Sequence, residues 1–192
     1  MSLDSTPICY LALDLDDALL RTDKSISSRT RATADQAVTQ DYYPVIATAR
    51  PPCAAEALLD GFLPDAPRIY YSGSRICIGT VCYLNRTIPS STAYRIVDDF
   101  LDRAPRATLA QITHADVSKS DTIRRVVERS GHVLSSVITF GDDTNNIEMI
   151  RAAGIGVAMA NAVSPVKSVA DHVTLSNDKD GVAIVIETLL LK

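Results

Sequence analysis

Short apolar runs alternate with longer segments of mixed polarity along most of the chain. Residues 8–13 (ICYLAL) form an apolar run that ends abruptly in the acidic letters DLDD, and residues 43–48 (YPVIAT) form a second run. Uninterrupted apolar runs of this length are typical of strands that are buried on both faces of a parallel sheet. Between them, Ser27 or Ser28 can cap a helix over residues 29–40, because a serine side chain accepts a hydrogen bond from a free amide of the first turn. The pattern predicts a strand, a helix and a second strand.

Helices and strands are expected to alternate through most of the remaining sequence. The expected elements are a helix from Pro51 or Pro52 to Leu59, strands at 68–72, 136–140, 155–159 and 172–175, and helices at 121–129, 145–153, 163–169 and 181–190. Such alternation predicts an α/β fold with a mainly parallel sheet.

Residues 73–116 interrupt this alternation. The runs RICI and VCYL flank a turn at Gly79 and are interpreted as the two strands of a hairpin. An amphipathic helix capped by Ser90 or Ser91 and a strand at 108–113 are expected to follow. The segment therefore predicts an inserted β-β-α-β unit.

The length of the chain fits one core with a small insert. A sequence of 192 residues can bury a single α/β core, with about forty to fifty residues left for an accessory unit. We predict a doubly wound, mainly parallel, Rossmann-like sheet in residues 1–72 and 117–192, and a small α+β cap in residues 73–116.

The composition is that of an ordinary globular protein. Hydrophobic residues make up 46% and charged residues 22% of the chain. No run of about 18 apolar residues is present, and the first residues lack the basic and apolar regions of a secretory signal. We therefore expect a soluble, cytoplasmic protein with no membrane contact. The net charge of −4 argues against nucleic acid as a partner, because affinity for a phosphate backbone needs clustered lysine and arginine.

The four cysteines form no C-x-x-C pair, which argues against a structural zinc site or a disulfide framework. Cys77 and Cys82 lie in the strands of the expected hairpin. We expect them to pack there as reduced thiols, because a buried thiol behaves as a small apolar group.

Polar residues follow three of the predicted strands. Ligands bind at the carboxyl ends of the strands in open parallel sheets, so these residues are candidates for a site. Carboxylates gathered at such an edge repel one another unless a cation or a proton intervenes, and a set of oxygen ligands favours Mg²⁺. The residues are Asp14, Asp16 and Asp17 after the first strand, Thr48 and Arg50 after the second, and Asp142, Asp143, Asn145 and Asn146 after the strand at 136–140.

Asp14 is the predicted nucleophile. An ionised aspartate can attack phosphorus once a metal and a cation neutralise the phosphoryl oxygens. Asp16, two residues further on, could protonate the leaving oxygen and later activate water. Its backbone carbonyl is also a candidate metal ligand.

Each of these residues also has a purely structural interpretation. Acidic residues after a strand often cap helices or form turns. Lys119 alone would be a solvated residue at a helix start, although its charge is unfavourable beside the positive amino end of a helix. Arg50 could bind an anionic substrate group or pair with a carboxylate. Their joint occurrence at matching strand ends favours the functional interpretation.

Four ordered motifs resemble those of the haloacid dehalogenase superfamily, in particular its Cof-type phosphatase branch with α/β (C2-type) caps. The resemblance spans nearly the whole chain, and it implies Mg²⁺-dependent hydrolysis of small phosphate monoesters, such as sugar phosphates, through an aspartyl-phosphate intermediate. The motifs are DLDDAL at 14–19, ATARP at 47–51, VSK at 117–119 and GDDTNNIEM at 141–149, and GVAMANAV at 156–163 and TLSNDKDGVA at 174–183 also resemble this branch.

The resemblance implies a role for each matching residue. The implied roles are Asp14 as nucleophile and metal ligand, Asp16 as acid/base and metal ligand, Thr48 as a donor to the phosphoryl group, Lys119 as the neutralising cation, Asp142 and Asn146 as holders of Mg²⁺, Asn145 as a phosphoryl ligand or a partner of Lys119, and Arg50, Ser72 and Gly73 as substrate-binding candidates.

Several positions depart from the family pattern. Asn146 stands where the family has a second acid, so we expect weaker magnesium binding. Asp17 replaces a glycine, and Ala18 replaces a threonine that braces the loop. Ser72 stands where relatives have an asparagine, and the insert is shorter than the usual cap, which predicts an open site.

Two other functions stay open. Asn146 and Ala18 motivate a relative that binds a phosphorylated ligand or a protein partner without hydrolysis, while a phosphotransferase or mutase would share the same intermediate. The edge of the hairpin at 75–84 could pair with a second copy. A homo-oligomer is therefore a candidate assembly.

Overall fold

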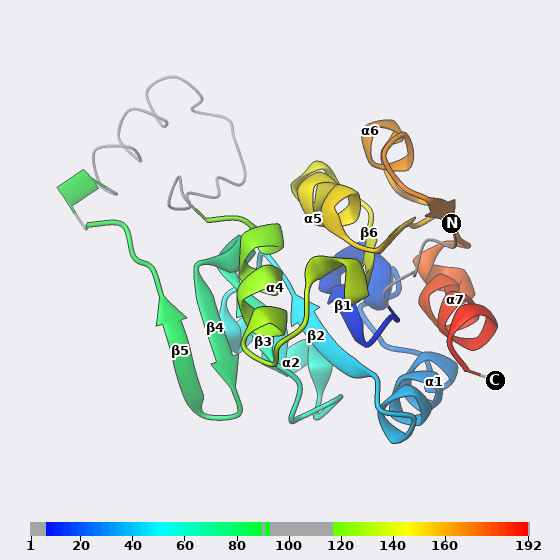
Figure 1. Ribbon diagram of the computed structural model, residues 1–192, viewed down its shortest axis with the longest axis horizontal. Coiled ribbons are helices and arrows are strands. Elements are labelled where there is room, and N and C mark those ends of the chain that lie inside the picture. The colour runs from blue at the N-terminus through cyan, green and yellow to red at the C-terminus, as the bar shows by residue number, and fades with distance from the viewer. Residues whose placement is uncertain (1–6, 90, 93–116, 192) are drawn as a thin grey trace.

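The computed structural model describes residues 7–89, 91–92 and 117–191, and the structural statements below concern these residues. The strands are β1 Tyr10–Asp14, β2 Tyr43–Ala47, β3 Arg68–Tyr70, β4 Arg75–Ile78, β5 Val81–Asn85, β6 Val137–Gly141, β7 Ile155–Ala158 and β8 His172–Val173. The helices are α1 Ser28–Thr39, α2 Pro52–Leu59, α4 Lys119–Glu128, α5 Ile147–Ala152, α6 Ser164–Lys167 and α7 Gly181–Leu189 (Figure 1).

The strands form one sheet in the order β5-β4-β3-β2-β1-β6-β7-β8. The neighbours from β3 to β8 are parallel, and β4 pairs antiparallel with both β3 and β5. The chain adds β2 and β3 on one side of β1, and it later adds β6, β7 and β8 on the other. The carboxyl end of β1 is thus the point at which the order reverses, where open α/β sheets bind ligands. The predicted doubly wound, mainly parallel sheet is confirmed.

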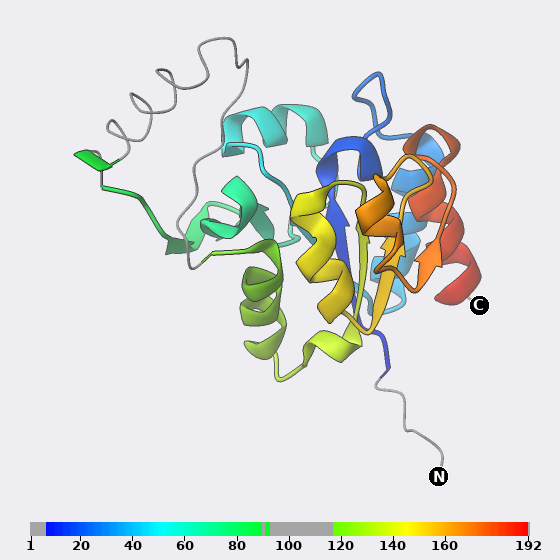
Figure 2. The same cartoon turned by 90° about the horizontal axis from the view of Figure 1, so that it is seen from above.

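Helices cover both faces of this sheet. Helices α1 and α7 contact each other on one face, and α4 and α5 contact each other on the opposite face (Figure 2). No helix within the described ranges is both long and apolar enough to span a bilayer.

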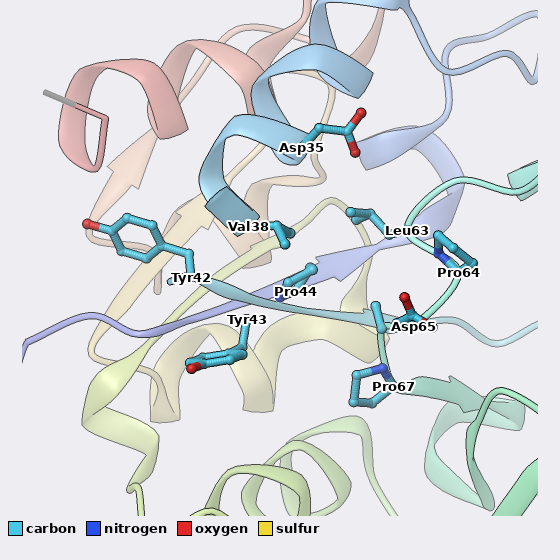
Figure 3. Close-up of a pocket in the computed structure, with 10 residues that line it drawn as sticks. Asp35, Val38, Tyr42, Tyr43, Pro44, Leu63, Pro64, Asp65 and Pro67 are labelled. Carbon is cyan, nitrogen blue, oxygen red and sulfur yellow. The ribbon is translucent and has the colours of Figure 1, made fainter. Parts of the chain in front are cut away.

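A cavity of about 290 Å³ opens at the amino ends of β2 and β3. The side chains of Val38, Pro44 and Leu63 lie around it, together with Tyr42 and Tyr43 (Figure 3). This cavity lies at the end of the sheet opposite to the polar residues singled out in the sequence. It is therefore not part of the candidate site.

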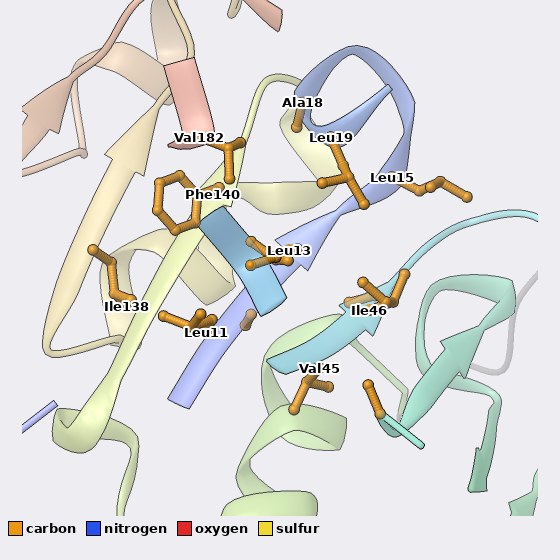
Figure 4. Packing of buried hydrophobic residues seen from close by; sticks show 14 of the residues in the cluster. Leu11, Leu13, Leu15, Ala18, Leu19, Val45, Ile46, Ile138, Phe140 and Val182 are labelled. Carbon is orange, nitrogen blue, oxygen red and sulfur yellow. The ribbon is translucent and has the colours of Figure 1, made fainter. Parts of the chain in front are cut away.

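The central strand β1 is buried along its whole length. Leu11 pairs with Ile138 and Leu13 pairs with Phe140 in the register of β1 and β6, and all four side chains are fully buried (Figure 4). Burying each such side chain contributes about 1.5–3 kcal/mol relative to leaving it in water. The packing of β1 therefore holds its last residue, Asp14, in a fixed place.

The hairpin expected in the cap is part of the core sheet. Strand β4 pairs with β3, with Arg68 opposite Cys77 and Tyr70 opposite Arg75, and β5 follows at the edge. The expected helix after residue 90 and the expected strand at 108–113 lie outside the described residues. The hairpin thus extends the core, and the division into a core and a cap stays a prediction for the rest of the insert.

The expectation of reduced thiols in this hairpin is wrong for one pair. Cys77 and Cys82 form a disulfide, while Cys9 and Cys53 are free. Cys77 and Cys82 face each other in the register of β4 and β5, with their Cα atoms 3.9 Å apart. The spacing in the sequence did not reveal this pair, because the turn between the strands brings the two residues together.

Two helix starts beside the candidate site differ from those predicted. Helix α4 begins at Lys119 rather than at residue 121, because the Ser118 side chain accepts a hydrogen bond from the Asp121 amide. The helix expected at 145–153 is preceded by a separate 3-10 turn, Thr144–Asn146. Both differences concern residues of the candidate site.

Candidate active site

Residues from distant parts of the sequence meet at the carboxyl end of β1. Asp14 is the last residue of β1, Thr48 follows β2, and Asp142 follows β6. Lys119 is the first residue of α4, and Asn146 ends the turn before α5. The structure thus brings together the residues that the sequence placed at separate strand ends.

Asp14, Lys119 and Asn146 form a closed set of hydrogen bonds. Lys119 Nζ lies 2.7 Å from Asp14 Oδ1 and 2.9 Å from Asn146 Oδ1, and Asn146 Nδ2 donates to Asp14 Oδ2 over 2.8 Å. The exposed fractions of the three residues are 5%, 2% and 0%. A buried lysine charge needs a paired anion and filled hydrogen bonds, and this set supplies both.

The orientation of the Asn146 amide bears on metal binding. Its oxygen faces Lys119, and its NH₂ group faces Asp14 and lies 3.4 Å from Asp142 Oδ1. A side-chain NH₂ is a donor and cannot coordinate a cation. In this arrangement Asn146 lessens the repulsion between two carboxylates but does not present a ligand to a metal.

Asp142 is the carboxylate that most needs a cation. Burial raises its pKa to about 7, helped by the negative charge of Asp14 and by the charges of Asp17 and Asp143. A divalent cation relieves the repulsion between two neighbouring carboxylates. The carboxylates of Asp14 and Asp142 are oxygen ligands of the kind that Mg²⁺ prefers. The described ranges contain no group of three or more His, Cys, Asp or Glu side chains arranged around a metal position.

Arg50 is paired with Asp16. Its Nε and Nη2 atoms each lie 2.7 Å from an Asp16 carboxylate oxygen, and Lys24 Nζ lies 3.4 Å from Oδ1. Burial opposes ionisation of Asp16, but the hydrogen bonds and charge of Arg50, with a smaller effect of Lys24, outweigh it and lower the pKa of Asp16. Of the two interpretations of Arg50, the structure shows the pairing with a carboxylate.

The loop after Asp14 is held by residues that the sequence analysis did not single out. Asp17 has a φ of 50°, a left-handed conformation that aspartate tolerates better than most residues and that glycine adopts freely. Asn161 Nδ2 donates to the Asp17 carbonyl over 2.6 Å, and Asn177 Nδ2 donates to the Leu20 carbonyl over 2.9 Å. These amides support the loop although Ala18 has no hydroxyl. Asn161 and Asn177 lie in the segments 156–163 and 174–183, which resemble the family. That resemblance was the signal in the sequence that could have identified them.

Thr48 is buried directly after β2, and its hydroxyl keeps a hydrogen that it can donate. It is 1% exposed, and its hydroxyl accepts a hydrogen bond from the Arg50 amide over 3.1 Å. A hydroxyl that accepts such a bond still has its own hydrogen to donate.

A pocket of about 300 Å³ opens beside Lys119. Ser72 and Asn145, both substrate-binding candidates, line it, and so does Glu148, which the sequence analysis did not identify. Glu148 lies within the motif at 141–149, two positions after Asn146. It is in the first turn of α5, and the 3-10 turn before that helix places it at the pocket.

Gly73 does not line this pocket. It has a φ of 112°, and a Cβ atom there would lie 2.5 Å from the Ser118 carbonyl oxygen. Its own carbonyl accepts a hydrogen bond from Thr122 Oγ1 over 3.0 Å. The structure therefore gives Gly73 a packing role, because its missing side chain lets the loop lie against the start of α4.

Comparisons with known proteins identify the family and the fold. A family model described as haloacid dehalogenase-like hydrolase matches residues 11–109 and 103–186. A solved haloacid dehalogenase-like hydrolase from Bacteroides thetaiotaomicron is 22% identical, with a TM-score of 0.83, and the match covers 96% of this chain and 100% of that one. A second, from B. subtilis, is 21% identical, with a TM-score of 0.82, and covers 95% and 100%.

Curated relatives match a shorter part of the sequence. The 5-amino-6-(5-phospho-D-ribitylamino)uracil phosphatase YcsE of Bacillus subtilis is 40% identical over 40% of this chain and 30% of its own length. A phosphoglycolate phosphatase of Archaeoglobus fulgidus is 42% identical over 41% of this chain and 35% of its own length. The match thus spans about a third of these relatives. Because the family model covers most of the sequence and the fold agrees, the chain belongs to the haloacid dehalogenase-like hydrolases, as its resemblance to their Cof-type phosphatases predicted.

Proposed function

We propose that the protein is a Mg²⁺-dependent phosphatase that hydrolyses small phosphate monoesters through an aspartyl-phosphate on Asp14. The observation that carries this proposal is the buried Asp14–Lys119 pair at the carboxyl end of β1, with an N–O distance of 2.7 Å. The pair combines a carboxylate nucleophile with a cation at the point where the order of the sheet reverses.

In this proposal Mg²⁺, when bound, supplies positive charge that draws phosphoryl oxygens toward Asp14. Asp14, Asp142 and the Asp16 carbonyl would hold it. Lys119 and the Thr48 hydroxyl would bind other phosphoryl oxygens, so that charge is balanced from several directions. These side chains are held in place by packing, which lowers the cost of organising them during the reaction.

The first half of the reaction transfers the phosphoryl group to the protein. An oxygen of Asp14 forms a bond to phosphorus while the bond from phosphorus to the leaving oxygen breaks, and Asp16 gives its proton to that oxygen. Because Arg50 lowers the pKa of Asp16, Asp16 must exchange this partner for the substrate before it can act as an acid.

The second half releases phosphate. Asp16, now ionised, takes a proton from water as the water oxygen bonds to phosphorus, and the bond between phosphorus and Asp14 breaks. Inorganic phosphate leaves, and both aspartates return to their starting states.

The direct test is turnover of an aryl phosphate by the purified protein, with Mg²⁺ and with EDTA. We expect activity with Mg²⁺ alone, and we expect Asp14→Asn to abolish it. Asp41→Asn is the matched control, because Asp41 is exposed. Thermal melting would show that both variants are folded. Full activity in Asp14→Asn would show that Asp14 is not the nucleophile.

The substrate class can be narrowed with a panel of phosphorylated metabolites. Sugar phosphates, phosphoglycolate and 5-amino-6-(5-phospho-D-ribitylamino)uracil are the first candidates, the last two because relatives are named for them. The carboxylate of Glu148 at the pocket disfavours a second anionic group on the substrate. We therefore expect neutral polyol phosphates to be hydrolysed faster than phosphoglycolate. Sugar acceptors in the same assay would reveal phosphotransfer.

A second candidate function is binding of a phosphorylated ligand without hydrolysis. It is favoured by Asn146, whose amide bridges Asp14 and Lys119 and needs no metal to do so. Beryllium fluoride with Mg²⁺ mimics the aspartyl-phosphate, so a rise in the melting temperature that needs both would support the phosphatase. No such rise, together with no turnover, would support the binding protein.

A further inference from the structure

Another cavity, of about 390 Å³, opens beside β3 and β4. Glu56, Arg68, Tyr70 and Arg75 are among the residues that line it, and it shares no residue with the pocket beside Lys119. The proposed reaction uses none of these side chains.

The pairing of β3 and β4 places two arginines on one face of the sheet. Arg68 is opposite Cys77 and Tyr70 is opposite Arg75, so these four side chains point to the same face. Arg68 and Arg75 are diagonal neighbours on that face, within about 7–8 Å at their backbones. Like charges so close repel each other unless an anion lies between them.

Each guanidinium has a buried nitrogen without a hydrogen-bond partner in the described part of the chain. Arg68 is 4% exposed, and its Nη2 atom donates to the carbonyls of Phe62 and Leu63 over 2.7 and 2.8 Å. Its Nη1 atom has no partner, and neither has Nε of Arg75. A buried donor without a partner costs about 1–3 kcal/mol, and more when the group is charged.

Among the described residues that line the cavity, Glu56 supplies the one negative charge. Glu56 Oε1 lies 3.3 Å from Arg68 Nε and also accepts a hydrogen bond from the Tyr70 hydroxyl over 2.7 Å. Burial, helped by the hydrogen bond and charge of Glu56, raises the pKa of Tyr70 well above its usual value, so Tyr70 is neutral. Of the charged side chains that line this cavity, two are thus cationic and one is anionic.

We propose that this cavity binds a small oxyanion, the phosphate or carboxylate group of a metabolite, between Arg68 and Arg75. Such a ligand balances the excess positive charge, and it accepts hydrogen bonds from both guanidinium groups once their buried, unpartnered nitrogens turn toward it. The site is distinct from the catalytic pocket and does not depend on hydrolysis.

The test follows the Nε–H signal of Arg75 in NMR spectra of ¹⁵N-labelled protein with EDTA, at constant ionic strength. Inorganic phosphate and malonate are titrated separately, because they distinguish a phosphate group from a carboxylate. We expect one or both to shift this signal and the Cys77 and Thr80 amides in a saturable way. Arg75→Gln should weaken the affinity by about tenfold or more, since a charge-assisted hydrogen bond contributes about 1.5–3 kcal/mol.

Arg151→Gln is the matched control, because Arg151 is exposed and lies on α5. It should leave the affinity unchanged. If neither anion moves the Arg75 signal, the proposal fails. It also fails if phosphate shifts only signals around Lys119, since the anion then binds the catalytic pocket alone. The titration of the unmodified protein decides the matter even if Arg75→Gln does not fold.

Discussion

The Nζ atom of Lys119 lies 2.7 Å from Oδ1 of Asp14, although 105 positions separate the two residues in the chain. Lys119 is almost completely buried, and the start of α4 places it there. The buried pair is the core of the proposed site, and the following predictions test the groups around it.

Replacing Lys119 should remove much of the activity. Lys119→Met keeps a side chain of similar length but leaves Asp14 without its cation. Loss of one preorganised electrostatic group commonly costs about 10²–10³-fold in kcat. Steady-state kinetics with an aryl phosphate would measure this. Lys179→Met, at an exposed position, should retain normal activity, and an equally active Lys119→Met would remove Lys119 from the mechanism.

Restoring an acid at position 146 should strengthen magnesium binding. Asn146→Asp replaces the NH₂ group that faces Asp14 and Asp142 with a carboxylate oxygen. We expect the Mg²⁺ concentration for half-maximal rate to fall by about tenfold. Without metal, the added charge should lower the melting temperature. Asn85→Asp adds the same charge at an exposed edge, and an identical magnesium titration in both variants would contradict this view of Asn146.

Removing Arg50 should raise the pKa of Asp16. Burial raises this pKa and Arg50 lowers it by hydrogen bonds and charge, with the lowering dominant. In Arg50→Ala, burial still raises the pKa of Asp16, and of the two cations only Lys24 is left to lower it. The Asp16 carboxyl should therefore titrate at higher pH than in the parent protein. The side-chain ¹³C signal of Asp16 reports this directly in metal-free protein. Arg151→Ala should give the parent titration, and a lower pKa in Arg50→Ala would refute the assigned pairing.

Substitutions at two glycines with positive φ distinguish the cost of a steric clash from the cost of backbone strain. A Cβ on Gly73 would lie 2.5 Å from the Ser118 carbonyl, whereas one on Gly79 would meet nothing within 4 Å. Both substitutions by alanine carry the strain of a left-handed residue, about 1–2 kcal/mol. Gly73→Ala should be clearly the more destabilising in urea denaturation, and it should also lower activity by displacing the start of α4. Equal losses of stability in the two variants would mean that the loop at Gly73 moves away from α4 without a further loss of stability.

Much of the core was predictable because its signals are local. The run at 8–13 and the serine before residues 29–40 predicted β1 and α1, and Ser27 does cap that helix by accepting from the Thr30 amide. The disulfide between Cys77 and Cys82 was missed, since it depends on the register of two strands. The hairpin was assigned to the cap because nothing in its own residues says that β4 pairs with β3.

The sequence was sufficient to predict the class of the sheet, the family and most of the polar residues at the strand ends. Alternation of elements and spacing within motifs depend on residues that are close together in the chain. The partners of those residues depend on folding. The Asp14–Lys119 contact, the Arg50–Asp16 pair and the direction of the Asn146 amide arise where strands and helices from distant segments converge. Hydrogen bonds and ion pairs act over a few ångströms, so they exist only once packing of the core has brought their groups together.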